Sequence, residues 1–517
     1  MSRFRTFLLT ICIALPLAFP ARPAARSGGD WHFPLPESMI RALDSITALS
    51  LRGHVSFLAS DALGGRATPS VGQDVAAEYI AAQFRRAGLE PVESNDYFQV
   101  SLMPESSPDC ASFRCVVQLQ GKSLEVSRAR FTLNAVTTLD IRQATVFKIS
   151  FGRRPAQDLR SLSGKILLTD TPNFQPDGIA GQKFASEWRH FMSLARSLSP
   201  ALIVRVDHEN RDPSAYFETP RLRSSGGSRG SPLIATINEP SIAQALDELP
   251  EGETGATFSL RVKEGQPDQR RLRNVAALLR GSDPTLRETY VLLTAHYDGT
   301  GPAASGMQDR IWNAANDDAS GVAALLDIAL ALGSLKDRPR RSVLFLAFFG
   351  EEDGMLGSHY YAAHPLVPFR NTIAAINLEQ LGRTDASEGD QTGRVNVTGY
   401  DYSEVGGVIK VAGDQSGLAV SGSEPDSDTY FTASDNIVLA EMGVPSHTLC
   451  VSYVYPDYHG AGDDWDKINY DNMSGVARMA ARALLLMALS DRDPLWNVSN
   501  PRAARFSEAR VRPGDSH

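Results

Sequence analysis

The sequence predicts an α/β fold in which a mixed, largely parallel sheet is flanked by helices and carries an inserted small β-rich domain. Strand-like and helix-like patterns alternate from Asn274 to Leu489, which is typical of a largely parallel sheet. The run Val343–Phe349 is apolar without a break, as expected for a strand that helices cover on both faces. Between residues 128 and 262 the pattern changes to strand-like runs separated by polar, glycine-rich and arginine-rich loops. We therefore expect a second domain there.

Length and composition indicate an ordinary globular protein. The chain has 517 residues, of which 42% are hydrophobic and 21% charged. This length is enough for about two to four domains. The net charge is −9, so the basic surface typical of nucleic-acid-binding proteins is not indicated. We expect no nucleic-acid partner, and the composition leaves the oligomeric state open.

The N-terminal segment has the pattern of a secretory signal. Two arginines precede the apolar run Phe7–Phe19, and small residues and prolines follow it. This run is too short to cross a bilayer and is typical of a signal peptide. We predict that residues 1–26 are removed and that the mature protein, without a membrane span, is exported to the periplasm or secreted.

Export affects what the cysteines can do. It makes a disulfide between Cys110 and Cys115 possible, since oxidising compartments permit such bonds. Cys450 lies in the apolar run HTLCV and is expected to be a buried small hydrophobic residue.

The remaining elements divide the chain into parts. In the first part, residues 27–127, the segment His54–Gly88 predicts two helices joined by a turn. The second part, residues 128–262, contains ATVFKISF, KILLTD, ALIVRV and LIATI as strands and a helix near Glu187–Arg196. The third part, residues 263–491, resumes the sheet and closes with a helix at about Asn472–Leu489. Residues 492–517 are polar and are expected to form a loose tail.

Residues of metal-ligand type occur where the predicted strands end or in the loops beyond. They are His296, Asp298, Asp317, Asp318, Glu351, Glu352, Glu379 and His459. Open α/β sheets bind ligands at the carboxyl ends of their strands. Mixed imidazole and carboxylate ligands suit zinc, and an additional bridging carboxylate suits two zinc ions.

Each of these features also has a structural interpretation. Acidic pairs often form solvated turns or helix caps, and a single histidine at a strand end is usually structural. Two adjacent carboxylates such as Glu351 and Glu352 need either a proton or a nearby cation. The joint position of these residues at one edge of one sheet favours the metal site.

The segments AHYD, NDDASG, NLEQLG and YHGAGDDWDK, with the EE pair after an apolar strand, resemble the zinc peptidases of family M28. This family includes bacterial leucyl-type aminopeptidases. The likeness extends over the chain from about His54, and SLSGKILLTD to ALIVRV resembles the protease-associated (PA) domain often inserted in these enzymes.

The resemblance implies two zinc ions and assigns a role to each site residue. Asp317 would bridge the ions, His296 and Glu379 would complete one site, and Glu352 and His459 would complete the other. Glu351 would be the general base that takes a proton from the bridging water. Asp298 would orient His296, and Tyr458 would match a tyrosine that stabilises the oxyanion in some members. A cis peptide bond between Asp317 and Asp318 is also implied.

The sequence departs from the family pattern at two positions. Glu379 stands where many members have aspartate, and Glu is longer but also binds metals. Asn436, in the segment Ser434–Asn436, replaces a histidine of the family. The second departure bears on the substrate pocket and not on metal binding.

The function expected from these features is an exported aminopeptidase that acts on peptides. The surplus of carboxylates would attract a free α-amino group, whereas a carboxypeptidase needs a cation such as Arg383. The alternatives within the fold are a carboxypeptidase and a one-zinc glutaminyl cyclase. Other classes are a receptor-like member without metals and a serine hydrolase that uses Ser228 of GGSRG.

Overall fold

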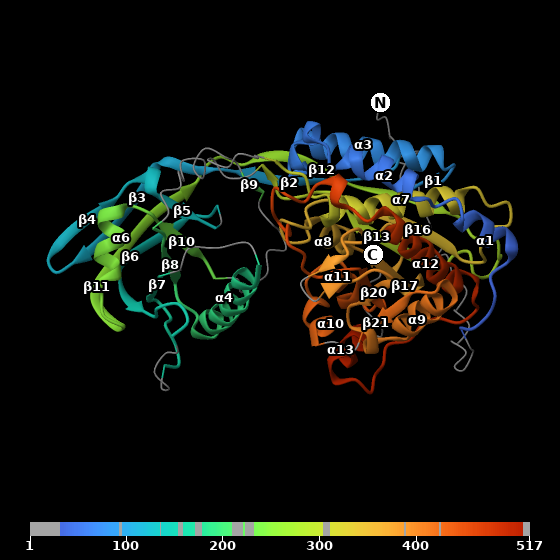
Figure 1. The fold of residues 1–517 in the computed structure, drawn as a ribbon. Coiled ribbons are helices and arrows are strands. Elements are labelled where there is room, and N and C mark those ends of the chain that lie inside the picture. Colours follow the sequence, from blue (N-terminus) through green and yellow to red (C-terminus); the bar gives the residue numbers. More distant parts are fainter. Residues whose placement is uncertain are drawn as a thin grey trace, which may run out of the picture.

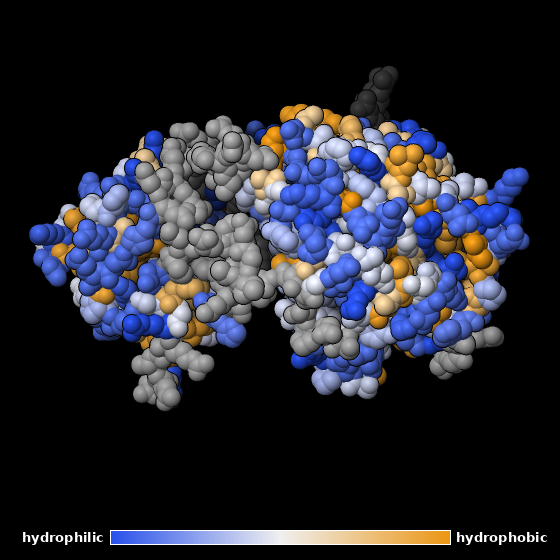
Figure 2. Space-filling model, in the orientation of Figure 1, coloured by the Kyte–Doolittle hydropathy of each residue, from blue (hydrophilic) through white to orange (hydrophobic). Residues whose placement is uncertain are grey.

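The computed structural model describes residues 31–509 except 93–95, 135, 154–158, 171–177, 209–220, 223–231, 303–310, 387–388 and 423–424. The predicted signal peptide and Ser228 lie outside the described residues. The chain forms two lobes, each built on its own sheet (Figure 1). No helix among the described residues is both long and apolar enough to cross a membrane. Hydrophilic residues cover much of the visible face of both lobes, with smaller apolar areas between them (Figure 2).

The larger lobe contains a mixed sheet. Its order is β21 (Ala419–Ser421), β20 (Arg394–Val397), β22 (Ser446–Cys450), β17 (Thr372–Leu378), β13 (Tyr290–His296), β16 (Ser342–Phe348), β12 (Asp268–Leu279), β2 (Phe98–Ser106) and β9 (Arg221–Leu222), and β1 (Glu90–Pro91) pairs with β12. The central strands β22, β17, β13 and β16 are parallel, and β12 and β2 continue the sheet in antiparallel pairing. The predicted fold class is confirmed.

Helices cover both faces of this sheet, and as a result every residue of β13, β16 and β17 is buried. One face packs against α1 (Glu37–Leu43), α2 (Ala48–Leu58), α3 (Val71–Arg86), α7 (Ser320–Gly333), α9 (Glu404–Ser416) and α12 (Tyr470–Leu489). The other packs against α8 (Leu356–Ala363) and α11 (Asn436–Glu441). Burial on both sides explains why these strands have continuous apolar sequences and not alternating ones.

Short elements complete the larger lobe. They are the strand pairs β14 (Gly301–Pro302) with β15 (Ile311–Trp312) and β18 (Asp385–Ala386) with β19 (Gly389–Asp390), the helices α10 (Pro425–Tyr430) and α13 (Pro501–Ala509), and single turns at Asp61–Arg66, Ala315–Ala319, Phe369–Asn371, Tyr400–Tyr402 and Trp465–Lys467.

The smaller lobe is built on a second sheet. Its order is β4 (Lys122–Val126), β3 (Pro108–Leu119), β11 (Gly252–Glu264), β6 (Leu139–Lys148), β7 (Ile166–Asp170), β8 (Leu202–Val206), β10 (Ile234–Ile237) and β5 (Phe131–Leu133). Helix α6 (Pro240–Asp247) packs in one of its hydrophobic clusters, and α4 (Gly178–Leu198) packs in another. A turn at Arg128–Arg130 precedes β5. The sheet includes β3 and β4, which precede the predicted domain start at residue 128.

A two-stranded ribbon joins the lobes (Figure 1). Strand β2 runs into β3 across Ser107, and β11 runs into β12 across residues 265–267. The backbone N–H of Gly265 donates to the carbonyl of Ser107 at 2.9 Å, so the antiparallel pairing continues between the lobes.

One sequence-based expectation is wrong, and one bond that the sequence left possible is not formed. Residues 492–509 do not form a loose tail, because Trp496, Ala503 and Phe506 are buried in a cluster with Phe431. Cys110 and Cys115 are not joined in a disulfide. Both lie on β3, whose pairing with β11 shifts register between Asp109 and Arg114, so β3 is not a regular extended strand between the two cysteines.

Candidate metal centre

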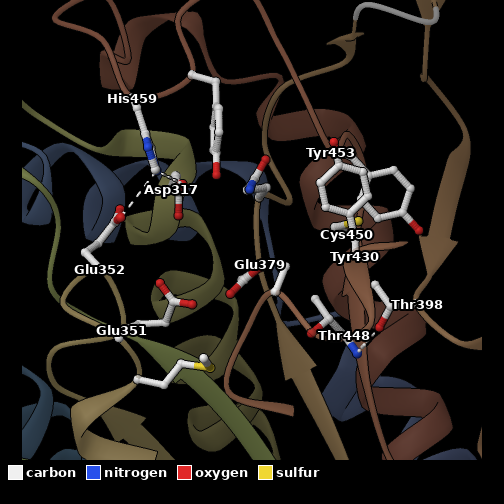
Figure 3. A pocket seen from close by; sticks show the side chains of 15 residues that line it. Asp317, Glu351, Glu352, Glu379, Thr398, Tyr430, Thr448, Cys450, Tyr453 and His459 are labelled. Atoms are coloured by element: carbon white, nitrogen blue, oxygen red, sulfur yellow. Dashed lines mark hydrogen bonds and ion pairs between the residues drawn. The ribbon is translucent and has the colours of Figure 1, made fainter. Parts of the chain in front are cut away.

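The predicted site residues converge at one edge of the larger sheet. His296 is the last residue of β13, Glu351 and Glu352 follow β16, and Glu379 follows β17. Because β13, β16 and β17 are parallel, their carboxyl ends lie at the same edge. Asp317, just before α7, and His459, in a loop after β22, reach the same place (Figure 3).

The chain turns sharply where it leaves β16. Gly350 has φ of 67°, a left-handed conformation that glycine adopts without steric cost. A Cβ at this position would lie 3.0 Å from the side chain of Leu356. The turn brings the Glu351 and Glu352 side chains to the cavity at the end of the sheet.

Asp317 lies between the two histidines. One carboxylate oxygen, Oδ1, is 3.1 Å from Nε2 of His296, and the other, Oδ2, is 3.2 Å from Nε2 of His459. Glu352 Oε2 is 3.3 Å from the same His459 nitrogen, and Glu379 Oε1 is 3.9 Å from Nε2 of His296. The residues therefore form two groups that share Asp317.

These separations suit metal binding. Zinc ligands at about 2.0–2.1 Å in a tetrahedral arrangement lie about 3.3–3.4 Å from one another. Asp317, Glu352 and His459 offer ligand atoms that all lie within 4.8 Å of each other. In addition, Glu352 Oε1 is buried without a hydrogen-bond partner in the described structure. The donor set and its spacing fit zinc.

The electrostatics of the cluster also favour a bound cation. Burial raises the pKa of Glu379 to about 8, and the Asp317 carboxylate contributes to the rise. Burial likewise raises the pKa of Glu352, next to Asp317. Burial lowers the pKa of His459, but hydrogen bonds to Asp317 and Glu352 outweigh it and raise this pKa to about 10. The crowded carboxylates thus favour any positive charge at the site, whether a proton or a metal cation.

Glu351 is adjacent to Glu352 but differs from it in its contacts. Its carboxylate lines the same cavity, yet the described hydrogen bonds and ion pairs include none between it and His296 or His459. Burial raises the pKa of Glu351 well above the usual range, and the carboxylates of Glu379 and Asp435 raise it further. A carboxyl group with a raised pKa is suited to proton transfer.

Asp298 contacts two segments that carry proposed ligands, the end of β13 and the turn after β16. Its Oδ1 lies 3.4 Å from Nδ1 of His296, and the same oxygen accepts the backbone N–H of Glu351 at 3.1 Å. Its Oδ2 accepts the backbone N–H of Glu352 at 3.3 Å and the hydroxyl of Thr68 at 3.2 Å. The expected contact with His296 is present, and the contacts with the Glu351–Glu352 turn are additional.

The peptide bond between Asp317 and Asp318 is cis, as the resemblance implied. Asp318 is fully buried and accepts the backbone N–H groups of Gly321, at 2.8 Å, and Gln380, at 3.3 Å. A Cβ on Gly321 would lie 2.4 Å from the Asp318 carboxylate, so only glycine leaves room for this contact.

Asp463 was not singled out from the sequence. It is buried and accepts the backbone N–H groups of Asn316, at 3.0 Å, and Asp317, at 3.2 Å, as well as the hydroxyl of Tyr455 at 2.9 Å. It therefore ties the His459 loop to the Asp317 loop. The signal was the paired acidic residues of the motif YHGAGDDWDK.

Arg66 was also missed. It is buried behind the site and donates to the backbone carbonyls of Tyr297, Asn313 and Ala314, each at 2.9 Å, and to that of Leu58. Burial lowers its pKa to about 10. Its only signal in the sequence was an arginine after the two glycines of LGGRA.

The site opens into a cavity of about 310 Å³. Asp317, Glu351, Glu352 and Glu379 line one end, and Tyr430, Tyr453 and Cys450 lie at the other (Figure 3). The rings of Tyr430 and Tyr453 stack with their centroids 4.5 Å apart and their planes at 7°. Tyr458 also lines the cavity, and its ring stacks on His459 at 4.0 Å. Cys450 is buried in the cavity wall, as expected of a small hydrophobic residue.

A buried polar network supports Glu379 and the cavity wall. The hydroxyl of Ser434 donates to Glu379 Oε1 and accepts from the Asn377 side-chain amide at 2.9 Å. Asn436, at the position where the family has a histidine, accepts from the Thr448 hydroxyl at 2.9 Å. Asn436 is fully buried and lies behind the cavity-lining residue Thr448.

Arg383 does not line the cavity. Its guanidinium is buried and pairs with Asp385 at 2.6 Å and Asp457 at 2.8 Å. The described residues that line the cavity include no lysine or arginine.

A model of peptidase family M28 matches residues 274–484, the part of the chain that carries every candidate metal ligand. Residues 274–484, which we call the M28 region, are similar to this family. The M28 region accounts for the parallel centre of the larger sheet and for every strand end at the candidate metal centre.

Curated relatives match the chain over limited lengths. The chain is 36% identical over 115 residues to a probable zinc metalloprotease of Pyrenophora teres f. teres, which covers 22% of this chain and 24% of that protein. It is 29% identical over 218 residues to the aminopeptidase NAALADL1 of Mus musculus, covering 36% of this chain and 29% of that protein. The chain spans about a quarter of the length of the first of these relatives.

A solved structure shares the fold. The aminopeptidase from Aneurinibacillus sp. strain AM-1 aligns with a TM-score of 0.51 and 18% sequence identity, covering 87% of this chain and 96% of that chain. At this level of identity the likeness shows the α/β fold alone.

Proposed function

We propose that this protein is an exopeptidase that holds two zinc ions and removes N-terminal residues from peptides. The position of Asp317 carries the proposal, since each of its two carboxylate oxygens faces a different histidine at 3.1–3.2 Å. His296 and Glu379 would hold one ion with Asp317, and Glu352 and His459 would hold the other. The names of the relatives, a zinc metalloprotease and an aminopeptidase, agree with this chemistry.

The protein's own groups have distinct roles in this proposal. Zinc ions bound at the site would lower the pKa of a water molecule and polarise the substrate carbonyl. Glu351 accepts the proton from that water and passes it to the leaving amine. The hydroxyl of Tyr458, at the edge of the cavity, stays protonated because burial raises its pKa well above the usual range. It can therefore donate a hydrogen bond to the developing oxyanion.

The described side chains that line the cavity support action at the amino end of peptides, because they offer no lysine or arginine for a terminal carboxylate. Four carboxylates line the cavity and the described lining residues include no basic side chain other than His459. A carboxypeptidase needs a cation for the terminal carboxylate. Arg383, the candidate for that role, is paired with Asp385 and Asp457 instead. Asp435 is fully buried, accepts the hydroxyl of Ser358 through Oδ1 and is not among the described residues that line the cavity.

The test compares three forms of one dipeptide: unblocked, N-acetylated and C-terminally amidated. We expect acetylation to abolish turnover and amidation to leave it largely unchanged. The reverse pattern would establish a carboxypeptidase and leave the metal site in place. Conversion of N-terminal glutamine to a pyroglutamyl residue, with release of ammonia and without peptide-bond hydrolysis, would identify a glutaminyl cyclase.

A second test separates the chemical classes. A zinc chelator should abolish activity and added zinc should restore it. Inactivation by a serine reagent with no effect of the chelator would favour the serine hydrolase. A folded protein that binds no zinc and cleaves no peptide would favour the receptor-like alternative.

Export and the nature of the smaller lobe belong to the same proposal. We expect residues 1–26 to be removed during export, which N-terminal sequencing of the protein from the periplasm or medium would test. The smaller lobe, with its eight-stranded sheet, would be a protease-associated domain.

A further inference from the structure

The loop that carries His459 is not held in place by burial of the histidine. The His459 side chain is 39% exposed, the largest exposed fraction among the proposed ligands. Its backbone has φ of 53°, in the left-handed region that residues other than glycine rarely adopt. Such a conformation persists only where neighbouring contacts enforce it.

Asp457 closes the turn that contains His459. Its backbone carbonyl accepts the N–H of Gly460 at 2.9 Å, so Tyr458 and His459 lie at the tip of the turn. A Cβ on Gly462 would lie 2.4 Å from Asp457 Oδ1, which shows how closely the next part of the loop packs on this carboxylate.

Arg383 anchors this turn from the segment that carries Glu379. Its Nη1 donates to Asp457 Oδ2 at 2.8 Å, and its Cζ lies 5.1 Å from the centroid of the Tyr455 ring. The backbone N–H of Arg383 donates to Asn316 Oδ1 at 2.9 Å, which connects it to the Asp317 segment as well. Arg383 therefore contacts or adjoins the three segments that carry Glu379, Asp317 and His459.

We infer that Arg383 is a positioning residue for the metal centre: its ion pair with Asp457 fixes the turn that presents His459. The inference rests on the proposed function, since His459 is a ligand only if zinc binds. Arg383 does not touch the cavity and has no direct role in binding or turnover. Its effect is on how well His459 is arranged before the metal arrives.

The experiment measures the zinc affinities of the full chain by competition with a chromogenic chelator. Arg383→Met and Asp457→Asn should each weaken one of two zinc sites about 10–100-fold, the usual effect of losing an outer contact to a ligand, and leave the other site unchanged. Asp457→Asn also removes the ion pair between Asp457 and Lys467 at 3.1 Å, so the double variant should be no weaker than Asp457→Asn alone.

Two controls separate positioning from general stability. Asp385→Asn removes the other, more exposed partner of Arg383 and should leave both zinc affinities unchanged. Arg341→Met removes a buried arginine that pairs with Asp493 at 3.0 Å, away from the metal centre. It should lower the melting temperature without changing zinc affinity in the folded protein.

Each outcome is decisive. Wild-type protein that binds no zinc would overturn the proposed function and this inference together. Two zinc ions in the wild type with unchanged affinity in Arg383→Met and Asp457→Asn would overturn this inference alone, as would independent, additive effects in the double variant. If Arg383→Met does not fold, Asp457→Asn tests the same contact at a less buried position.

Discussion

Asp298 Oδ1 accepts the backbone N–H of Glu351 at 3.1 Å while lying 3.4 Å from the imidazole of His296. One carboxylate oxygen thus lies against both the imidazole of a proposed ligand and the backbone of the proposed general base. Because Asp298 is fully buried, neither contact is shared with solvent. The end of β13 and the turn after β16 are held as one unit.

Asp298→Asn should disturb both functions. An amide carries less negative charge toward the imidazole and offers one acceptor oxygen where the carboxylate offers two. We expect zinc affinity to fall about 10–100-fold and kcat to fall even at saturating zinc. Chelator competition and steady-state kinetics measure the two effects separately. Unchanged kcat in the zinc-saturated variant would contradict a role in placing Glu351.

Asp317→Asn should remove the link between the two proposed zinc sites. Each carboxylate oxygen of Asp317 faces a different histidine, and the amide of Asn has only one oxygen. One of the two proposed zinc sites therefore loses an oxygen ligand. We expect the metal content, measured by mass spectrometry of the purified protein, to fall from about two zinc ions to about one or fewer. Wild-type protein that stays folded but takes up no zinc on reconstitution would contradict the assignment of the site.

Glu351→Gln and Glu352→Gln should differ in kind although the residues are adjacent. Glu352 contacts His459 at 3.3 Å, so its replacement should lower zinc content. Glu351 is expected to move a proton, so Glu351→Gln should keep both ions and lower kcat about 10²–10⁴-fold. The two variants serve as controls for each other. Equal loss of zinc from both would show that the roles are assigned incorrectly.

His447 should make the fold sensitive to acid. Burial lowers its pKa to about 4, and the neutral ring accepts the Ser403 hydroxyl at 2.6 Å and donates to the Thr398 carbonyl at 2.8 Å. The unfolded chain takes up this proton near pH 6.5, so stability should fall as the pH drops from about 6.5 to about 4, by up to about 3 kcal/mol in total.

The variant His447→Gln tests this pH dependence. Its melting temperature should be lower than wild type at neutral pH and should fall less between about pH 6.5 and 4.5. Chelator in all samples removes the contribution of zinc. His364→Gln, at an exposed position, is the control and should keep the wild-type slope. An unchanged slope in His447→Gln would contradict the prediction.

Much of the fold follows from local sequence patterns. The apolar runs that end at His296, Phe349 and Leu378 have the length and composition of strands covered on both faces, and the structure contains β13, β16 and β17 there. Parallel pairing then brings their ends together whatever the details of the loops. For this reason the positions of Glu351, Glu352 and Glu379 at one sheet edge could be predicted before any coordinates were known.

Other features depend on contacts between distant segments, which no local pattern encodes. The polar C-terminal segment forms the packed helix α13, because Phe506 packs against Phe431 and Trp496.

The same distinction holds within the candidate site. The sequence by itself determined which residues could bind metal and where the strands that carry them would end. Only the tertiary structure decided that Asp298 reaches the Glu351 backbone, that Asp463 holds the Asp317 loop, and that Arg383 turns from the cavity toward Asp457. The reason is physical: ligand type is a property of single side chains, whereas their orientation depends on hydrogen bonds between loops that meet only in the folded chain.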